Sequence, residues 1–224
     1  MIRQLRHPVR HWLWRRRTRG RPGQWPDPCQ RVVDAPLLAV DLEMTGLDAR
    51  SDEIVSLGWV AIDQGAIDLS SAREIRVSRS SGVSVGHSAT IHGLRDCDLG
   101  DQPDLDHGLR ALLAAVRGRI AVFHHAALDL AFLDRACRRH VDQAWPTPFI
   151  DTLQWFRKRL HLARPADHAA RGEATLAAAS RHFGLVQRSR HGALEDALSC
   201  AELVLALGHH SRARLVEVAR LPPK

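Results

Sequence analysis

Residues 36–48 read PLLAVDLEMTGLD, an apolar run that ends in two acids, Asp41 and Glu43. The apolar run predicts a buried strand, and side chains two residues apart on a strand point to the same face. The two carboxylates therefore lie close together, and each raises the pKa of the other unless a cation lies between them. Ligands bind at strand ends in open α/β sheets. The pattern favours a site for a hard divalent cation, although many strands also end in solvated acids.

Two further acids stand where such a site needs additional ligands. Asp129 lies six residues after the apolar segment 120–123, at the start of an expected helix. Asp196 lies near the start of the last expected helix, five residues after His191. Five residues turn an ideal helix by about 500°, so the two side chains cannot face the same way from one helix. We therefore expect His191 in the preceding loop, from where it can fold back over Asp196.

The order of apolar patterns predicts an α/β domain with a mixed central sheet and helices on both faces. The turn at Gln64-Gly65 connects two strands so tightly that they must be antiparallel. The Ser- and Gly-rich segment 78–101 indicates a long functional loop. The expected strands are 37–43, 53–62, a third that ends near Val77, and 120–123, and Phe149-Ile150 leads into a further helix. The expected helices are 103–117, 128–140, 151–160, 174–183 and 193–207.

Composition is that of one globular domain, because 224 residues with 45% hydrophobic and 25% charged side chains bury one good core. No apolar run approaches the about 18 residues of a membrane span, so no membrane partner is expected. Neither an apolar leader nor a C-x-x-C pair is present, and the cysteines indicate free thiols in a reducing compartment, the cytoplasm. They are Cys29, Cys97, Cys137 and Cys200.

The net charge of +7 is concentrated at the N-terminus, where residues 1–31 carry nine arginines and one acid, Asp27. Trp12, Trp14 and Trp25 alternate with these arginines, a pattern that suits a polyanion because guanidinium groups pair with phosphates and indoles stack on bases. A solvated arm and a transit peptide are the alternatives. We expect a basic, flexible arm and linker at 1–34, a catalytic domain at 35–210 and a short tail at 211–224.

Three motifs in order resemble those of the DnaQ-like DEDDh exonuclease family, which includes the proofreading epsilon subunit of DNA polymerase III, oligoribonuclease and RNase T. They are DLExTGL at 41–47, HHAALD at 124–129 and HxxLxDA at 191–197. The resemblance covers about 36–207 and includes ATIHGL at 89–94 and IDT at 150–152. It implies an RNase H-like fold and removal of nucleotides from a 3′ end.

The resemblance also implies a role for each acid. Two divalent cations, Mg²⁺ or Mn²⁺, would activate water and stabilise the attacking and leaving oxygens. Asp41 would bridge both ions, Glu43 and Asp196 would hold the ion that carries the water, and Asp129 would hold the other. His191 would accept the proton as the general base. The sister subfamily uses tyrosine in this role, and this chain contains none.

A pocket for the terminal nucleotide follows from the same resemblance. His125 and Leu128 stand where family members usually have Asn and Phe, and we expect these changes to tune the pocket without loss of the metals. Leu47 would wedge between bases. The expected substrate-binding residues are Thr45, Gly46, Leu47, His92, His125 and Leu128.

The predicted function is a metal-dependent 3′→5′ exonuclease on single-stranded ends, with DNA favoured, and with a DNA polymerase as a possible partner. Only about 17 residues follow the last expected helix, few for a polymerase-binding tail. The alternatives are an oligoribonuclease-like exoribonuclease, a non-catalytic nucleic-acid-binding module and an accessory subunit whose arm docks another protein. A zinc site at His124-His125 lacks nearby Cys or acidic ligands. We interpret Asp151 as a helix N-cap.

Overall fold

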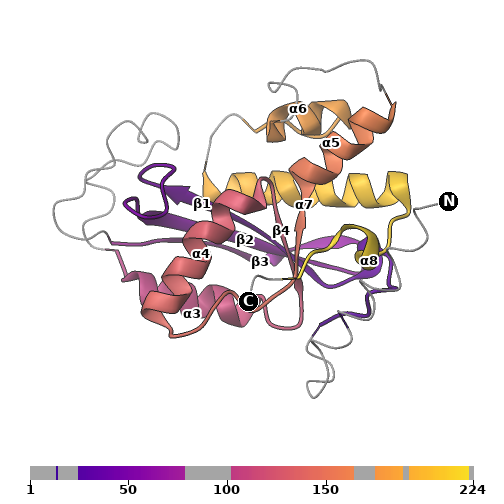
Figure 1. Cartoon of the computed structure of the whole chain (residues 1–224). Helices are drawn as coiled ribbons and strands as arrows, with labels where there is room; N and C mark the ends of the chain where they lie inside the picture. The colour runs from indigo at the N-terminus through magenta and orange to yellow at the C-terminus, as the bar shows by residue number, and fades with distance from the viewer. Residues whose placement is uncertain (1–13, 15–24, 79–101, 164–174, 189–191, 222–224) are drawn as a thin grey trace.

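The computed structural model describes Trp14 and residues 25–78, 102–163, 175–188 and 192–221. In these parts of the chain, five strands form one sheet in the order β3-β2-β1-β4-β5 (Figure 1). The strands are β1 (Leu37–Met44), β2 (Ile54–Asp63), β3 (Ala66–Arg76), β4 (Ile120–Phe123) and β5 (Phe149–Asp151). The helices are α3 (Leu105–Ala115), α4 (Ala126–His140), α5 (Thr152–Ala163), α6 (Leu176–His182), α7 (Ala193–Ser211) and α8 (Leu215–Val218), with a 3₁₀ turn, η1, at Val32–Asp34.

The sheet is mixed, as the sequence predicts. β1 pairs antiparallel with β2, and β2 pairs antiparallel with β3. The hairpin between β2 and β3 turns at Gln64 and Gly65, whose φ values of 51° and 78° suit a tight turn. β1 and β4 are parallel, and so are β4 and β5. The carboxyl ends of β1, β4 and β5 therefore lie side by side at the same end of the sheet.

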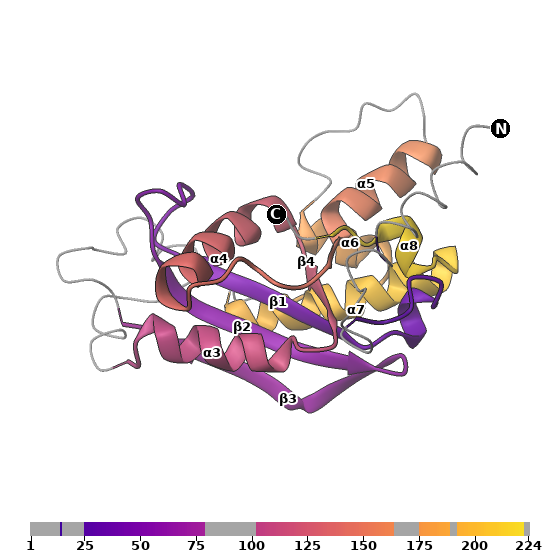
Figure 2. The ribbon, with the colours of Figure 1, turned by 60° about the horizontal axis from the view of Figure 1, so that its bottom comes forward.

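Helices cover both faces of the sheet, which confirms the predicted architecture. Alternate residues of β1 face opposite sides, so that Leu37 and Ala39 join one core cluster and Leu38 and Val40 join the other. The first cluster includes buried residues of α5, α6, α7 and α8. The second includes those of α3 and α4, the two helices that cross the near face in Figure 2. β1 is the central strand between the two layers.

The packed core extends beyond the domain limits, residues 35 and 210, that are expected from the sequence. Trp14 is 4% exposed, and its ring lies 5.9 Å from that of Trp25 in an edge-on contact. This indole packs against the protein, so the expectation that it stacks on bases is not met for Trp14. At the other end, Leu215 in α8 is fully buried. Residues 25–34 of the predicted arm are described as well, and Val32 and Val33 of η1 are buried in the domain. The arm residues 1–13 and 15–24 lie outside the described residues.

Two helices differ from expectation in ways that matter for the site. α4 begins at Ala126, two residues earlier than predicted, because Ala126 is buried and His125 turns the chain in a left-handed conformation with φ 85°. α7 runs to Ser211, four residues further than expected. Among the described residues, no helix combines the length and apolar character that a membrane span needs.

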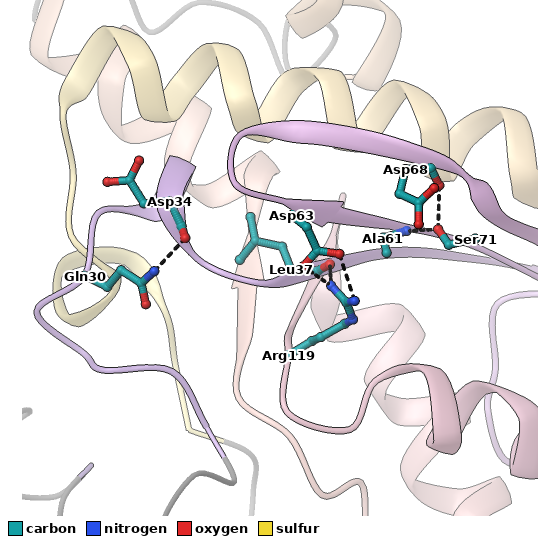
Figure 3. Close-up of polar contacts among 8 residues, drawn as sticks. All are labelled: Gln30, Asp34, Leu37, Ala61, Asp63, Asp68, Ser71 and Arg119. Carbon is teal, nitrogen blue, oxygen red and sulfur yellow. Dashed lines mark hydrogen bonds and ion pairs between the residues drawn. The ribbon is translucent and has the colours of Figure 1, made fainter.

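The edge of the sheet opposite the carboxyl end of β1 is fixed by polar contacts (Figure 3). Arg119, just before β4, makes a bidentate ion pair with Asp63 at 2.7 and 2.9 Å. The same guanidinium donates to the Leu37 carbonyl at 3.3 Å. Ser71 bridges a bulge between β2 and β3 by accepting the Ala61 N–H at 2.8 Å. These contacts link the residue before β4 to the start of β1 and the end of β2, and they link β2 to β3.

Candidate active site

Three carboxylates meet at the carboxyl end of β1. Asp41 and Glu43 project from this strand, and Asp196 projects from the first turn of α7. One oxygen from each lies within 4.8 Å of the others. Glu43 is 9% exposed, and Asp41 and Asp196 are partly exposed. The structure thus brings together acids that are more than 150 residues apart in the chain.

Gly58 makes the approach of α7 possible. It pairs with Asp41 in the β1–β2 ladder. A β-carbon at Gly58 would lie 2.1 Å from the carbonyl carbon of Ala193 and 2.4 Å from the backbone nitrogen of Leu194. Because the glycine has no side chain, the first turn of α7 lies directly on β2 and carries Asp196 to the other acids. Sequence reasoning missed this residue, although a glycine inside an apolar strand signals close approach of another backbone.

Asp129 is not one of these three ligands, but it lies near enough for its charge to raise the pKa of Asp41. It lies in the first turn of α4 and is 5% exposed. Burial raises its pKa from 3.8 to about 8, with further increases from the charges of Asp151 and Glu43, while its own backbone N–H offsets part of the rise. The carboxyl end of β4 leads into this turn through His124 and His125. The parallel pairing of β4 with β1 therefore places Asp129 beside the β1 acids.

Burial and mutual repulsion raise the pKa values of Asp41, Glu43 and Asp129. Burial raises the pKa of Asp41 well above 3.8, and the charges of Asp129, Asp196 and Glu43 raise it further. The pKa of Glu43 is likewise raised from 4.5 to about 8. Burial is the main cause, and the charges of Asp196, Glu74 and Glu195 add to it. A divalent cation would relieve this repulsion. The donors are all carboxylate oxygens, which suit Mg²⁺ or Mn²⁺ better than zinc.

Comparison with known proteins agrees with this geometry. The model of the RNase T exonuclease family matches residues 38–204, which include all four acids. The chain belongs to this exonuclease family.

Relatives of this exonuclease-family chain include polymerase subunits. It is 29% identical over 172 residues to the PolC-type DNA polymerase III of Thermotoga maritima, a match that covers 77% of this chain and 12% of that protein. It is 23% identical to the DNA polymerase III epsilon subunit of Aquifex aeolicus, covering 79% and 82%. The complex of Escherichia coli exonuclease I with single-stranded DNA shares the fold, with a TM-score of 0.66 at 12% identity over 80% of this chain and 41% of that one. The chain thus spans about an eighth of the length of the PolC-type relative.

Asp151 contributes a fifth carboxylate to this edge of the exonuclease domain. As predicted, it caps α5, since its Oδ1 accepts the Gln154 N–H at 3.0 Å. It is also only 7% exposed and raises the pKa of Asp129. Its position as the last residue of β5, parallel to β4, explains both facts. Sequence reasoning found the cap and missed the contribution to the site.

A hydrogen-bonded group lies beneath the acids. The Nδ1 atom of His124 lies 2.9 Å from the hydroxyl of Thr152, and that hydroxyl also contacts the Phe123 carbonyl at 3.1 Å. Buried Cys200 follows, with its sulfur 3.7 Å from the same hydroxyl. Among the described residues, the group of possible metal ligands is Asp41, Glu43 and Asp196, and it includes neither histidine of the 124–125 pair.

The loop after β1 is held by its own side chains. The Thr45 hydroxyl accepts the Glu53 N–H at 3.0 Å and donates to Asp52 at 3.4 Å. Asp52 also accepts the Asp48 N–H at 2.8 Å. A β-carbon at Gly46 would lie 2.4 Å from this carboxylate, so a larger residue there would displace the Asp52 side chain and its hydrogen bonds. The loop presents Leu47 at its tip with 77% of the residue exposed.

The remaining predicted residues fall into two groups. His125 is exposed at the start of α4, and Leu128 is partly buried against the α3–α4 cluster. Both lie within four residues of Asp129. His92 and His191 lie outside the described residues. Arg188, the last described residue before the segment that contains His191, forms a bidentate ion pair with Glu202 of α7 at 2.8 and 2.9 Å.

Proposed function

We propose that this chain is a metal-dependent 3′→5′ exonuclease that hydrolyses the terminal phosphodiester of single-stranded nucleic acid. The observation that carries the proposal is the meeting of Asp41, Glu43 and Asp196 within 4.8 Å, with buried Asp129 beside them. Four carboxylates would repel a phosphate backbone unless cations stood between them. A non-catalytic binding module would have no use for such a group.

The acids supply the ligands for two divalent ions, Mg²⁺ or Mn²⁺. When bound, the ions would activate water and stabilise the attacking and leaving oxygens. We assign Asp41 to both ions, Glu43 and Asp196 to the ion that carries the water, and Asp129 to the other. The carboxylates must release protons before they bind the ions. Because their pKa values are raised, the metal affinity should depend steeply on pH near neutrality.

His191 is the proton acceptor in this proposal. It lies outside the described residues, one residue before Gly192, the N-cap of α7. An imidazole with an ordinary pKa near ~6.5 accepts a proton at neutral pH, and such a base contributes about 10² to 10⁴ in rate. The absence of tyrosine from the chain leaves histidine as the residue for this role.

The loop tip and the start of α4 form the proposed terminal-nucleotide pocket. Exposed Leu47 is available to wedge between bases, and His125 can donate to a sugar or phosphate. We add His92, Thr45, Gly46 and Leu128 to this pocket by resemblance. DNA is the proposed substrate, supported by relatives named as DNA polymerase subunits and by the fold shared with exonuclease I bound to single-stranded DNA. RNA is the alternative, decided by contact with a 2′-hydroxyl.

A polymerase partner and a cytoplasmic location complete the proposal. The polymerase partner is supported by the names of the relatives. The cytoplasm is supported by free thiols at Cys137 and Cys200. Burial raises the pKa of Cys137 to about 12, so this thiol is inert.

The decisive experiment compares strands labelled at the 3′ or the 5′ end, as matched DNA and RNA, with Mg²⁺ or Mn²⁺ added to metal-free protein. We expect immediate release of labelled mononucleotide from the 3′-labelled strand and a ladder from the 5′-labelled one. Asp41→Ala should abolish both, while Asp34→Ala, which removes an exposed acid at the far edge, should not. Retention of the strand with no product from the wild-type protein would support the binding-module alternative.

A further inference from the structure

We propose that Thr152 is a positioning residue for the candidate active site, because its hydroxyl joins the three segments that carry Asp129, Asp151 and Asp196. This inference rests on the proposed function, since it concerns how the acids of that site are placed. Thr152 is the first residue of α5 and directly follows Asp151, the last residue of β5. Its side chain is fully buried.

Three groups meet at this hydroxyl. It donates to the Phe123 carbonyl, at the end of β4, at 3.1 Å, and it lies 2.9 Å from Nδ1 of His124, the next residue. The Cys200 sulfur of α7 lies 3.7 Å away. A hydroxyl has one hydrogen and two lone pairs, and a carbonyl can only accept. The hydrogen therefore goes to Phe123, and the Nδ1–H of His124 and the S–H of Cys200 donate to the two lone pairs.

The partners of this hydroxyl lie close in the chain to two of the acids. His124 is followed five residues later by Asp129, across the left-handed turn that begins α4. Cys200 lies four residues after Asp196, which is about one turn along α7 and on the same side of the helix. The hydroxyl thus fixes the end of β4 and the first turns of α7 relative to each other.

The charges of the acids reach this junction. Burial raises the pKa of the Cys200 thiol well above its usual value, the hydrogen bond with Thr152 lowers it, and the charges of Asp41, Asp129 and Asp151 raise it further. Cys200 therefore lies within electrostatic range of three of the acids. It also keeps its proton, as a donor to Thr152 must.

The acids need such a junction because they repel one another. The charges of Asp129, Asp196 and Glu43 all raise the pKa of Asp41, after burial as the main cause. Before a cation is bound, this repulsion pushes apart the elements that carry the carboxylates. Backbone ladders hold β4 to β1 and to β5. Thr152 adds α7 to these strands through Cys200.

Thr147 is the matched control, because it is a second buried threonine at the other end of the same strands. It is 3% exposed, and its hydroxyl donates to the Arg119 carbonyl at 2.7 Å. Arg119 directly precedes β4, and Thr147 lies two residues before β5. Valine at either threonine removes a buried hydroxyl and leaves a carbonyl without its donor. Both substitutions should therefore lower the melting temperature.

The test measures Mn²⁺ binding to the full chain by calorimetric titration without nucleic acid, and then kcat and KM for release of the 3′ nucleotide. Thr152→Val should raise the Kd for Mn²⁺ and lower kcat, each by about tenfold, the lower end of the range for groups that orient metal ligands from outside. KM for the strand should stay unchanged. Thr152→Ser keeps the hydroxyl and should keep the wild-type Kd and kcat. Thr147→Val should change the melting temperature alone.

Cys200→Ala tests the link to α7 in a variant that keeps the Thr152 hydroxyl. A thiol is a weak donor, so the Kd for Mn²⁺ should rise by less than in Thr152→Val. Cys137→Ala is the control for this variant, since it removes a buried thiol from α4 and should leave the Kd unchanged. If Thr152→Val does not fold, a wild-type Kd in Cys200→Ala overturns the inference.

The inference is also overturned if folded Thr152→Val binds Mn²⁺ with the wild-type Kd, if Thr152→Ser fails to restore it, or if Thr147→Val raises it equally. These outcomes are separate from the fate of the proposed function. A wild-type protein that binds Mn²⁺ but releases no nucleotide would contradict the proposed exonuclease activity, and the comparison of Kd values would still decide the role of Thr152.

Discussion

Gly58 and Ala193 touch backbone to backbone, so that a β-carbon on the glycine would lie 2.1 Å from the Ala193 carbonyl carbon. Gly58→Ala should therefore push the first turn of α7, and Asp196 with it, away from β1. Overpacking of this kind costs about 1–3 kcal/mol of stability. A displacement near 1 Å can lower the rate about 10²-fold. We therefore expect a large loss of kcat in a protein that still folds, with only a moderate decrease of the melting temperature.

Gly108→Ala provides the comparison for this variant. A β-carbon there would meet the end of the flexible Leu57 side chain at 2.9 Å, which can yield. We expect Gly108→Ala to retain activity. Full activity in Gly58→Ala would show that α7 does not need this contact to place Asp196.

The acids predict that the metal-free protein loses stability as the pH rises. The folded-state pKa values of Glu43 and Asp129, both about 8, lie above their ordinary values of 4.5 and 3.8. A raised pKa means that the folded state holds its proton more tightly, so the stabilisation is complete below about pH 4 and is lost between pH 4 and 8. Thermal unfolding in chelator from pH 4 to 9 should show this decline. A flat profile would contradict the burial of ionisable acids here.

Divalent ions should reverse that loss at the alkaline end. Mg²⁺ or Mn²⁺ binds the ionised carboxylates, so apparent affinity should rise until about pH 8 and then level off. An ion at about 100 times its Kd adds about 2.7 kcal/mol to the free energy of unfolding. Asp41→Asn removes one of the repelling charges, and it should raise the metal-free melting temperature at pH 8 while abolishing the shift with Mg²⁺. Calorimetric titration in two buffers would count the protons released.

Leu47 should act on substrate and not on the fold. It is 77% exposed, so Leu47→Ala should change the free energy of unfolding by less than about 0.5 kcal/mol. Loss of a wedge of this size should raise KM for a single strand roughly fivefold, or about 1 kcal/mol. Leu69→Ala, at a residue 69% exposed on β3, should change neither quantity. If both variants had the same KM, Leu47 would not be part of the nucleotide pocket.

The sequence predicts what depends on local pattern. Alternation along β1 placed Asp41 and Glu43 on one side, and Gln64-Gly65 predicted the hairpin. Features that depend on residues far away in the chain were not predicted. The role of Gly58 needs α7 against β2, and the burial of Trp14 needs Trp25. The four residues of α8 are too few to show a helical period.

Asp151 shows the same limit and leads to a last prediction. An acid before a helix indicates an N-cap from local pattern alone, whereas its repulsion of Asp129 depends on the parallel pairing of β4 and β5. Asp151→Asn keeps an oxygen that can accept the Gln154 N–H but removes the charge. The pKa of Asp129 should then fall, and Mn²⁺ affinity at pH 6.5 should rise relative to that at pH 8.5.

Asp151→Ala separates the two roles of this residue. It also removes the charge, so the same change in the pH dependence of Mn²⁺ binding is expected. In addition it removes the cap, which should lower the free energy of unfolding by about 1 kcal/mol relative to the Asn variant. Calorimetric titration at the two pH values and denaturant unfolding measure these effects. If Asp151→Asn bound Mn²⁺ with the wild-type pH dependence, Asp151 would be a helix cap alone, and the acidic group would end with Asp129.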